Sequence, residues 1–149
     1  MKELTQVAEI TISYKPALNR MPLIATTLDA YVELKEFFSE EIIRLQEEFL
    51  VMYLNNGNRV LGVHKLSKGG LTGTIADIRL ILGTALKTAA CSIILCHNHP
   101  SGTLKPSISD IEITKKIIEA GKFMDIRVLD HLIISPDDRY ISLSEEGLI

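Results

Sequence analysis

Two histidines separated by one residue, His97 and His99, are the first candidates for chemistry in the sequence. They follow Ser92–Cys96, a short apolar segment typical of a buried strand. Because alternate residues of an extended chain point the same way, both imidazoles can converge on one ion. Pro100 has no backbone N–H for a sheet, so the pair is expected at a strand end, accessible to a ligand. Two histidines at a polar strand end without a ligand remain the alternative.

Asp110 adds a third candidate ligand. It lies one turn into a predicted helix, and the residues at i+3 and i+7 are Ile113 and Ile117, so its carboxylate is expected to face inward. An inward carboxylate is costly to bury unless it is paired or bound to a metal ion. Two histidines and one carboxylate leave the fourth tetrahedral position of Zn²⁺ to water, the pattern of catalytic zinc. Other divalent ions would also accept these ligands.

The residues Ser107 to Asp110 have a second interpretation. Ser-x-x-Asp is a capping box, a motif that is common at helix starts and that predicts a helix beginning here. The two interpretations are compatible, because the N-terminus of a helix favours an anionic group beside it.

The string His97-x-His99-Pro100, six further residues and Ser107-x-x-Asp110 matches the JAMM motif of the MPN/JAB metallopeptidase superfamily. This resemblance implies that His97, His99 and Asp110 hold one Zn²⁺ per chain. It also implies an MPN/JAB-like fold, with layers arranged as in cytidine deaminases. The zinc deaminase motifs HxE and PCxxC are themselves absent from the sequence.

More narrowly, the chain resembles the RadC family, from about Asp29 to Ile149. RadC proteins commonly carry an N-terminal helix-hairpin-helix module, and we expect this chain to be a stand-alone domain without it. Within the resemblance, we interpret Asp130 and His131 as a structural pair. The residues that carry the resemblance are His97-Asn98-His99-Pro100-Ser101-Gly102, Pro106-Ser107, Ile126 and Leu129-Asp130-His131.

JAMM enzymes also need an upstream glutamate, and the sequence offers Glu47 and Glu48. Neighbouring residues of a strand face opposite sides, so only one of them can face the metal. Periodicity alone leaves the choice open. The segment Gln46-Glu47-Glu48-Phe49 is similar to the Gln-Glu-x-Phe pattern of RadC sequences, which assigns the role to Glu47.

The resemblance implies a zinc-dependent metallopeptidase or isopeptidase with a peptide or protein substrate. Zinc lowers the pKa of a bound water from 15.7 towards about 7. Glu47 would act as general base and then return the proton to the leaving amine. Ser107 would donate a hydrogen bond to the oxyanion.

Two other functions stay open at this point. A metal-stabilised binding module would keep the ligands without turnover, although the full set of JAMM residues favours activity. An accessory role in DNA repair or recombination is suggested by the RadC name. The net charge of −3 and the pI of about 5.8 oppose nucleic-acid binding, which relies on basic surfaces.

Composition describes the context of the site. The 149 residues are 46% apolar and 23% charged, which is typical of one globular domain, 1–149, with 1–28 as an N-terminal strand and loop extension. Cys91 and Cys96 are too few for a disulfide framework. The sequence shows neither a signal peptide nor an apolar run of roughly 20 residues, so we expect a cytoplasmic protein without a membrane span.

The elements that must position the site mix strands and helices without strict alternation. Asn55 to Asn58 form a predicted hairpin turn, which favours an α+β sandwich with a mixed sheet, a central hairpin and about three flanking helices. We expect one helical stripe at Ile78, Leu82, Ala85 and Ala89, and another at Ile113, Ile117, Ala120 and Met124. Asp29 is expected to cap a helix that runs to about Gln46, and a glycine-bearing loop is expected at Lys68–Thr74. The expected strands are Val7–Ser13, Glu47–Leu54, Arg59–Leu66, Ser92–Cys96, Ile126–Ile134 and Arg139–Leu143.

Overall fold

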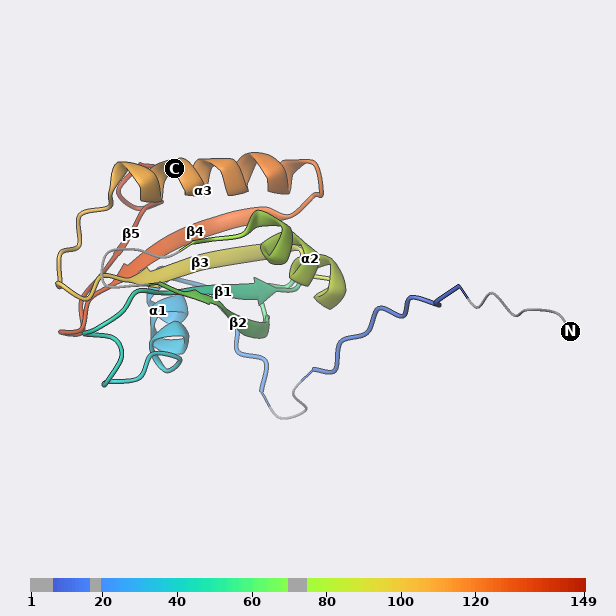
Figure 1. The fold of residues 1–149 in the computed structure, drawn as a ribbon, viewed down its shortest axis with the longest axis horizontal. Coiled ribbons are helices and arrows are strands. Elements are labelled where there is room, and N and C mark those ends of the chain that lie inside the picture. Colours follow the sequence, from blue (N-terminus) through green and yellow to red (C-terminus); the bar gives the residue numbers. More distant parts are fainter. Residues whose placement is uncertain (1–6, 17–19, 70–74) are drawn as a thin grey trace, which may run out of the picture.

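A mixed sheet of five strands, in the spatial order β2-β1-β3-β4-β5, organises the protein (Figure 1). The structure is a computed structural model, and it describes residues 7–16, 20–69 and 75–149. No helix in these residues is long and apolar enough to cross a membrane. The elements are α1 (Thr27–Lys35), β1 (Glu48–Leu54), β2 (Val60–Lys68), α2 (Ile78–Thr88), β3 (Ser92–Asn98), α3 (Ile108–Lys122), β4 (Arg127–Ile134) and β5 (Tyr140–Ser142).

The strand directions confirm the predicted α+β class with a mixed sheet. β1 is antiparallel to β2 and to β3, β3 is parallel to β4, and β4 is antiparallel to β5. The β1–β2 hairpin lies at one edge of the sheet and not at its centre, with β2 outermost. This position suits the residues, because β1 and β3 are buried throughout whereas most of β2 is half-buried or exposed.

Two apolar cores lie on opposite faces of the sheet. One contains α1 residues together with Leu50, Met52 and Cys96, and the other contains α2 and α3 residues together with Val51 and Leu95. Figure 1 shows α1 below the sheet and α3 above it. Because side chains alternate along a strand, parity assigns every residue of β1 and β3 to one of these faces.

The first helix differs from the prediction at both ends. It spans Thr27–Lys35 and is followed by turns, where the sequence predicted a helix to about residue 46. Thr26, and not Asp29, is the N-cap: its hydroxyl accepts from the Asp29 N–H, and the Asp29 carboxylate accepts from the Thr26 N–H at 2.8 Å. Asp29 therefore completes a capping box from inside the helix.

The N-terminal segment differs more from its predicted structure than the first helix does. The predicted strand at 7–13 is extended but pairs with no strand among the described residues, and it projects away from the domain in Figure 1. Val7 and Ile10 are 90% and 87% exposed, so alternation alone did not make a strand where no neighbour supplies hydrogen bonds. The predicted extension at 1–28 and the predicted loop at 68–74 include residues 1–6, 17–19 and 70–74, which lie outside the described residues.

The buried stripes of two helices are also displaced from the prediction. In α2 the fully buried residues are Ile81 and Ala85, whereas Ala89 is the exposed left-handed C-cap. In α3 the buried residues are Thr114, Ile117 and Gly121, and the expected Met124 lies beyond the helix and is exposed. Hydrophobicity misplaced the α3 stripe because two of its three buried residues are a threonine and a glycine.

Gly121 allows α3 to pack against the start of β4, which generates a first prediction. A Cβ at this position would lie 2.4 Å from the Ile126 carbonyl oxygen, a backbone atom that cannot move aside cheaply. Gly121→Ala should therefore lower the free energy of unfolding by about 1–3 kcal/mol, as overpacking does. Gly83→Ala, on the exposed side of α2 with no atom within 4 Å, should instead raise it by up to about 1 kcal/mol. Urea denaturation measures both; equal effects would contradict the packing argument.

Candidate metal centre

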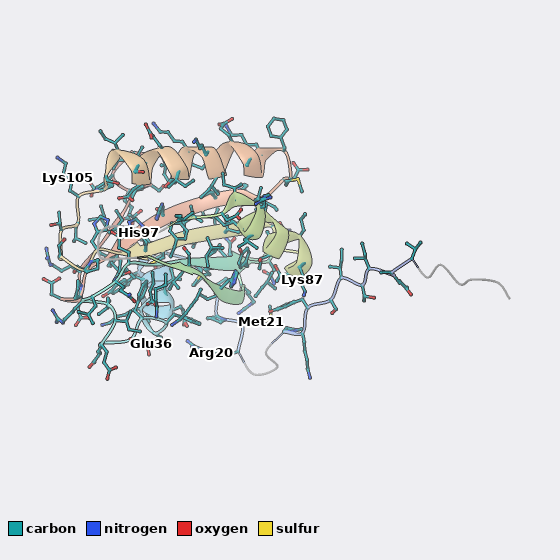
Figure 2. The ribbon with its side chains drawn as sticks, in the orientation of Figure 1. Arg20, Met21, Glu36, Lys87, His97 and Lys105 are labelled. Atoms are coloured by element: carbon teal, nitrogen blue, oxygen red, sulfur yellow. The ribbon has the colours of Figure 1, made fainter. Side chains whose placement is uncertain are left out.

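The carboxyl end of β3 brings the two histidines together. His97 is 1% exposed and lies on the face covered by α2 and α3, and His99 is just beyond the strand. The His99 N–H donates to the Ile134 carbonyl at 3.0 Å, so pairing with β4 continues one residue past β3. The strand alternation is thereby kept, and the two Nε2 atoms lie 3.0 Å apart. Figure 2 shows His97 at the end of the sheet opposite the end near Lys87.

The first turn of α3 supplies the carboxylate. Asp110 Oδ1 lies 3.4 Å from His97 Nε2, and Asp110 Oδ2 lies 3.4 Å from His99 Nε2. The capping box is present in the same residues: Ser107 Oγ accepts from the Asp110 N–H, and Asp110 Oδ2 accepts from the Ser107 N–H at 2.8 Å. The cap therefore holds the carboxylate against the histidines, so the predicted capping box is confirmed and is compatible with a ligand role for Asp110.

The geometry of these three side chains fits a divalent metal ion. Their candidate ligand atoms all lie within 4.8 Å of one another. Two ligands bound at about 2.0–2.1 Å in a tetrahedron, as around zinc, lie about 3.3 Å apart. The observed separations of 3.0, 3.4 and 3.4 Å match that spacing. Two imidazole nitrogens facing each other at 3.0 Å also need a cation or a proton between them, because their lone pairs repel.

The charge of the cluster favours a cation. Burial raises the pKa of Asp110, but the neighbouring imidazoles of His97 and His99 outweigh it and hold that pKa well below its usual range. Burial lowers the pKa of His99, but hydrogen bonds to Asp110 and to the Thr103 carbonyl outweigh it and raise that pKa. The carboxylate is therefore ionised at moderate pH, and its negative charge favours a cation beside it.

The two upstream glutamates lie in different environments. Glu47 lines a cleft of about 260 Å³ beside the cluster, and His97 and Asp110 line the same cleft. Glu48 points to the other face, where it is 5% exposed and lies 3.8 Å from the Lys68 ammonium. The structure thus brings Glu47, but not Glu48, together with the candidate ligands. The remaining lining residues are Phe49, Ile75, Ala76, Ser109 and Ile113.

Ser107 caps α3, and Ser109 lines the cleft. Ser107 is the exposed N-cap of α3, its oxygen accepts a backbone hydrogen bond, and none of the described residues accepts its hydroxyl proton. Ser109 lines the cleft, although nothing in the sequence pattern singled it out. Both hydroxyls therefore lie near Asp110 at the same end of the helix.

Asn98, which sequence reasoning did not assign, anchors the segment that carries Glu47. Its amide nitrogen donates to the carbonyls of Ile43 and Gln46, both at 2.9 Å, and its amide oxygen accepts from the Glu48 N–H at 2.7 Å. Asn98 is fully buried on the face opposite His97. Its side chain therefore bonds the backbone on both sides of Glu47 and restrains the position of the Glu47 backbone.

His131 and Asp130, predicted as a structural pair, are both buried and hydrogen-bonded, but their side chains contact different partners. The His131 ring contacts His97 and Thr114 on the α3 side of the sheet. The Asp130 carboxylate accepts from the Ser142 hydroxyl and from the Ser144 N–H, and its only bond to His131 is with the backbone N–H. The alternation of β4 separates the two side chains, because neighbouring residues face opposite sides.

The amino-acid sequence is similar to one family of proteins. Residues 26–148 match the family described as "RadC-like JAB domain". A "UPF0758 protein" of Flavobacterium johnsoniae is 44% identical over 129 residues, which cover 87% of this chain and 55% of the relative. A "UPF0758 protein" of Porphyromonas gingivalis is 37% identical over 151 residues, covering 99% and 65%. The chain thus spans between about half and two thirds of the length of these curated relatives.

The three hydrogen bonds of Asn98 generate a second prediction. Asn98→Ala leaves one N–H and two carbonyls without their partner, and a buried unsatisfied group costs about 1–3 kcal/mol. We expect the free energy of unfolding to fall by at least about 2 kcal/mol, measured by urea denaturation. Asn56→Ala, in the exposed hairpin turn, should change it by less than about 0.5 kcal/mol. Similar small losses in both variants would show that Asn98 is not the anchor.

Proposed function

Because the chain belongs to the family of RadC-like JAB domains, we propose that it is a zinc-dependent metallohydrolase that cleaves a peptide or isopeptide bond. The observation that carries the proposal is the cluster of His97, His99 and Asp110 beside a cleft that His97 and Asp110 line together with Glu47. Two imidazoles, one carboxylate and a neighbouring acid are the groups that metal-assisted hydrolysis needs.

The three ligands would act through defined atoms. His97 and His99 would bind through Nε2, and Asp110 through a carboxylate oxygen. Phe49 stacks on His97 with the two rings nearly parallel and their centroids 6.0 Å apart, which restrains the imidazole. A zinc ion held here would polarise a substrate carbonyl and acidify a water molecule.

Glu47 would move the proton. Glu47 lines the cleft, and its carboxylate would accept a proton from the attacking water and then deliver it to the leaving amine. The Ser107 hydroxyl, whose oxygen already accepts from the Asp110 N–H, would donate its proton to the oxyanion of the tetrahedral intermediate. Asn98 would support both steps indirectly, because it fixes the backbone on both sides of Glu47.

The cleft suits a peptide-like substrate. One part of its wall is apolar, formed by Phe49, Ile75, Ala76 and Ile113, and another part carries the carboxylates and His97. An apolar wall beside polar groups can bind a side chain while the polar groups face the bond to be cleaved. A peptide or isopeptide amide fits this division.

Metal content tests the ligand set directly. Purified protein should carry about one Zn²⁺ per chain by elemental analysis, because four-coordinate zinc needs three protein ligands and a water. His97→Ala and Asp110→Ala should each lower the occupancy sharply while circular dichroism shows a folded protein. His64→Ala, which removes a histidine of β2 outside the cluster, should leave occupancy unchanged. Full occupancy in both ligand variants would refute the assignment.

Turnover tests the role of Glu47. Glu47→Gln should keep the zinc and the stability but lower the rate by roughly 10²–10⁴-fold, the usual share of acid–base catalysis. A library of peptide and isopeptide bonds supplies the substrate for this measurement.

Glu48→Gln is the matched control, since the same change is made on the opposite face of the strand. Its rate per zinc-loaded protein should stay close to that of the unchanged protein. If Glu48→Gln is the inactive, zinc-loaded variant instead, the two glutamates exchange roles. If the unchanged protein binds zinc and no bond in the library is cleaved, the metal-stabilised binding module is the better account.

A further inference from the structure

A chain of three buried hydrogen bonds links His97 to the backbone of α3 through His131 and Thr114. His97 Nδ1 lies 2.7 Å from His131 Nε2. His131 Nδ1 lies 2.6 Å from Thr114 Oγ1, and Thr114 Oγ1 lies 2.6 Å from the Asp110 carbonyl oxygen. His131 and Thr114 are both fully buried, so no water competes for these bonds. His131 and Thr114 are not among the proposed ligands. Their hydrogen bonds determine which ring nitrogen of His97 carries the proton.

The Asp110 carbonyl, at the end of this series of hydrogen bonds, decides which group donates and which accepts at each step. A carbonyl oxygen can only accept, so the Thr114 hydroxyl must donate its single proton to the Asp110 carbonyl. The Thr114 oxygen must then accept from His131, which places a proton on His131 Nδ1. A fully buried imidazole without a carboxylate partner carries one proton, so His131 Nε2 is an acceptor. His97 must therefore donate from Nδ1.

We propose that His131 and Thr114 are positioning residues that hold His97 in its Nδ1–H tautomer. With the proton fixed on Nδ1, the lone pair of His97 lies on Nε2, the atom that faces His99 and Asp110. The opposite tautomer would direct an N–H into the cluster and block a cation there. The consequence for metal binding rests on the proposed function, whereas the tautomer itself is a property of the metal-free protein.

His99 provides an internal comparison. Its Nδ1 lies 2.6 Å from the Thr103 carbonyl oxygen, which can only accept. His99 is therefore fixed in the same tautomer by one direct bond within its own loop. His97 lies in the core, where no backbone carbonyl of the described residues bonds its Nδ1. It is linked to the carbonyl of Asp110 through two side chains, His131 and Thr114.

Nitrogen NMR of the metal-free protein tests the tautomer without any variant. Long-range ¹H–¹⁵N spectra of protein labelled at histidine, recorded at mildly alkaline pH, separate protonated from unprotonated ring nitrogens. The expected result is Nδ1–H for His97, His99 and His131. A proton on Nε2 of His97 would overturn the proposal, whether or not the protein binds zinc.

Thr114→Val tests the role of the chain, because valine keeps the shape and removes the hydroxyl. His131 can then turn its proton to Nε2 and donate to His97, so the Nε2–H tautomer of His97 should appear in the spectra. The affinity for Zn²⁺, measured by competition with a chelator, should fall roughly 10–100-fold, as for other outer-shell partners of metal ligands. Thr114→Ser should restore both the tautomer and the affinity.

Thr88→Val is the matched control, since the Thr88 hydroxyl also bonds a carbonyl one turn earlier, at 2.9 Å, but in α2. It should change neither spectrum nor affinity. Thr114→Val with the tautomer and the affinity of the unchanged protein would refute the positioning role. If the unchanged protein shows the predicted tautomers but binds no zinc, the proposed function fails and the hydrogen-bond chain stands.

Discussion

The two-residue alternation at the carboxyl end of β3 is the constraint on which the site depends. It directs His97 to the face covered by α2 and α3, and it directs Asn98 to the face covered by α1. His97 can therefore join the histidine cluster while its neighbour Asn98 forms hydrogen bonds with the backbone on both sides of Glu47. A shift of one residue in the pairing of β3 would exchange these faces and separate the candidate base from the candidate ligands.

The first turns of α3 complete what β3 begins. α3 belongs to the crossover between the parallel strands β3 and β4, so its N-terminus lies near the carboxyl end of β3. Asp110 at this end closes the capping box and faces the histidines, and Thr114, one turn later, meets His131 from β4. A cap, a candidate ligand and a hydrogen-bond chain thus share one rigid element.

The sequence predicted the parts of the site that short spacings encode. His97, His99 and Asp110 were identified because strand and helix periods fix their relative directions over a few residues. The choice between Glu47 and Glu48 needed a family resemblance, because β1 is buried on both faces and its pattern shows no preferred side. The contacts of Thr114 with His131 and of Asn98 with Ile43 join residues 17 and 55 positions apart, and no local pattern reports such contacts.

X-ray absorption at the zinc edge of zinc-loaded protein tests the central claim most directly, because it identifies the atoms bound to the metal. The account predicts a shell of only nitrogen and oxygen at about 2.0–2.1 Å, with the outer-shell scattering of two imidazoles. A sulfur neighbour at about 2.3 Å would contradict it, because it would place the ion at Cys91 or Cys96 and not at the histidine cluster.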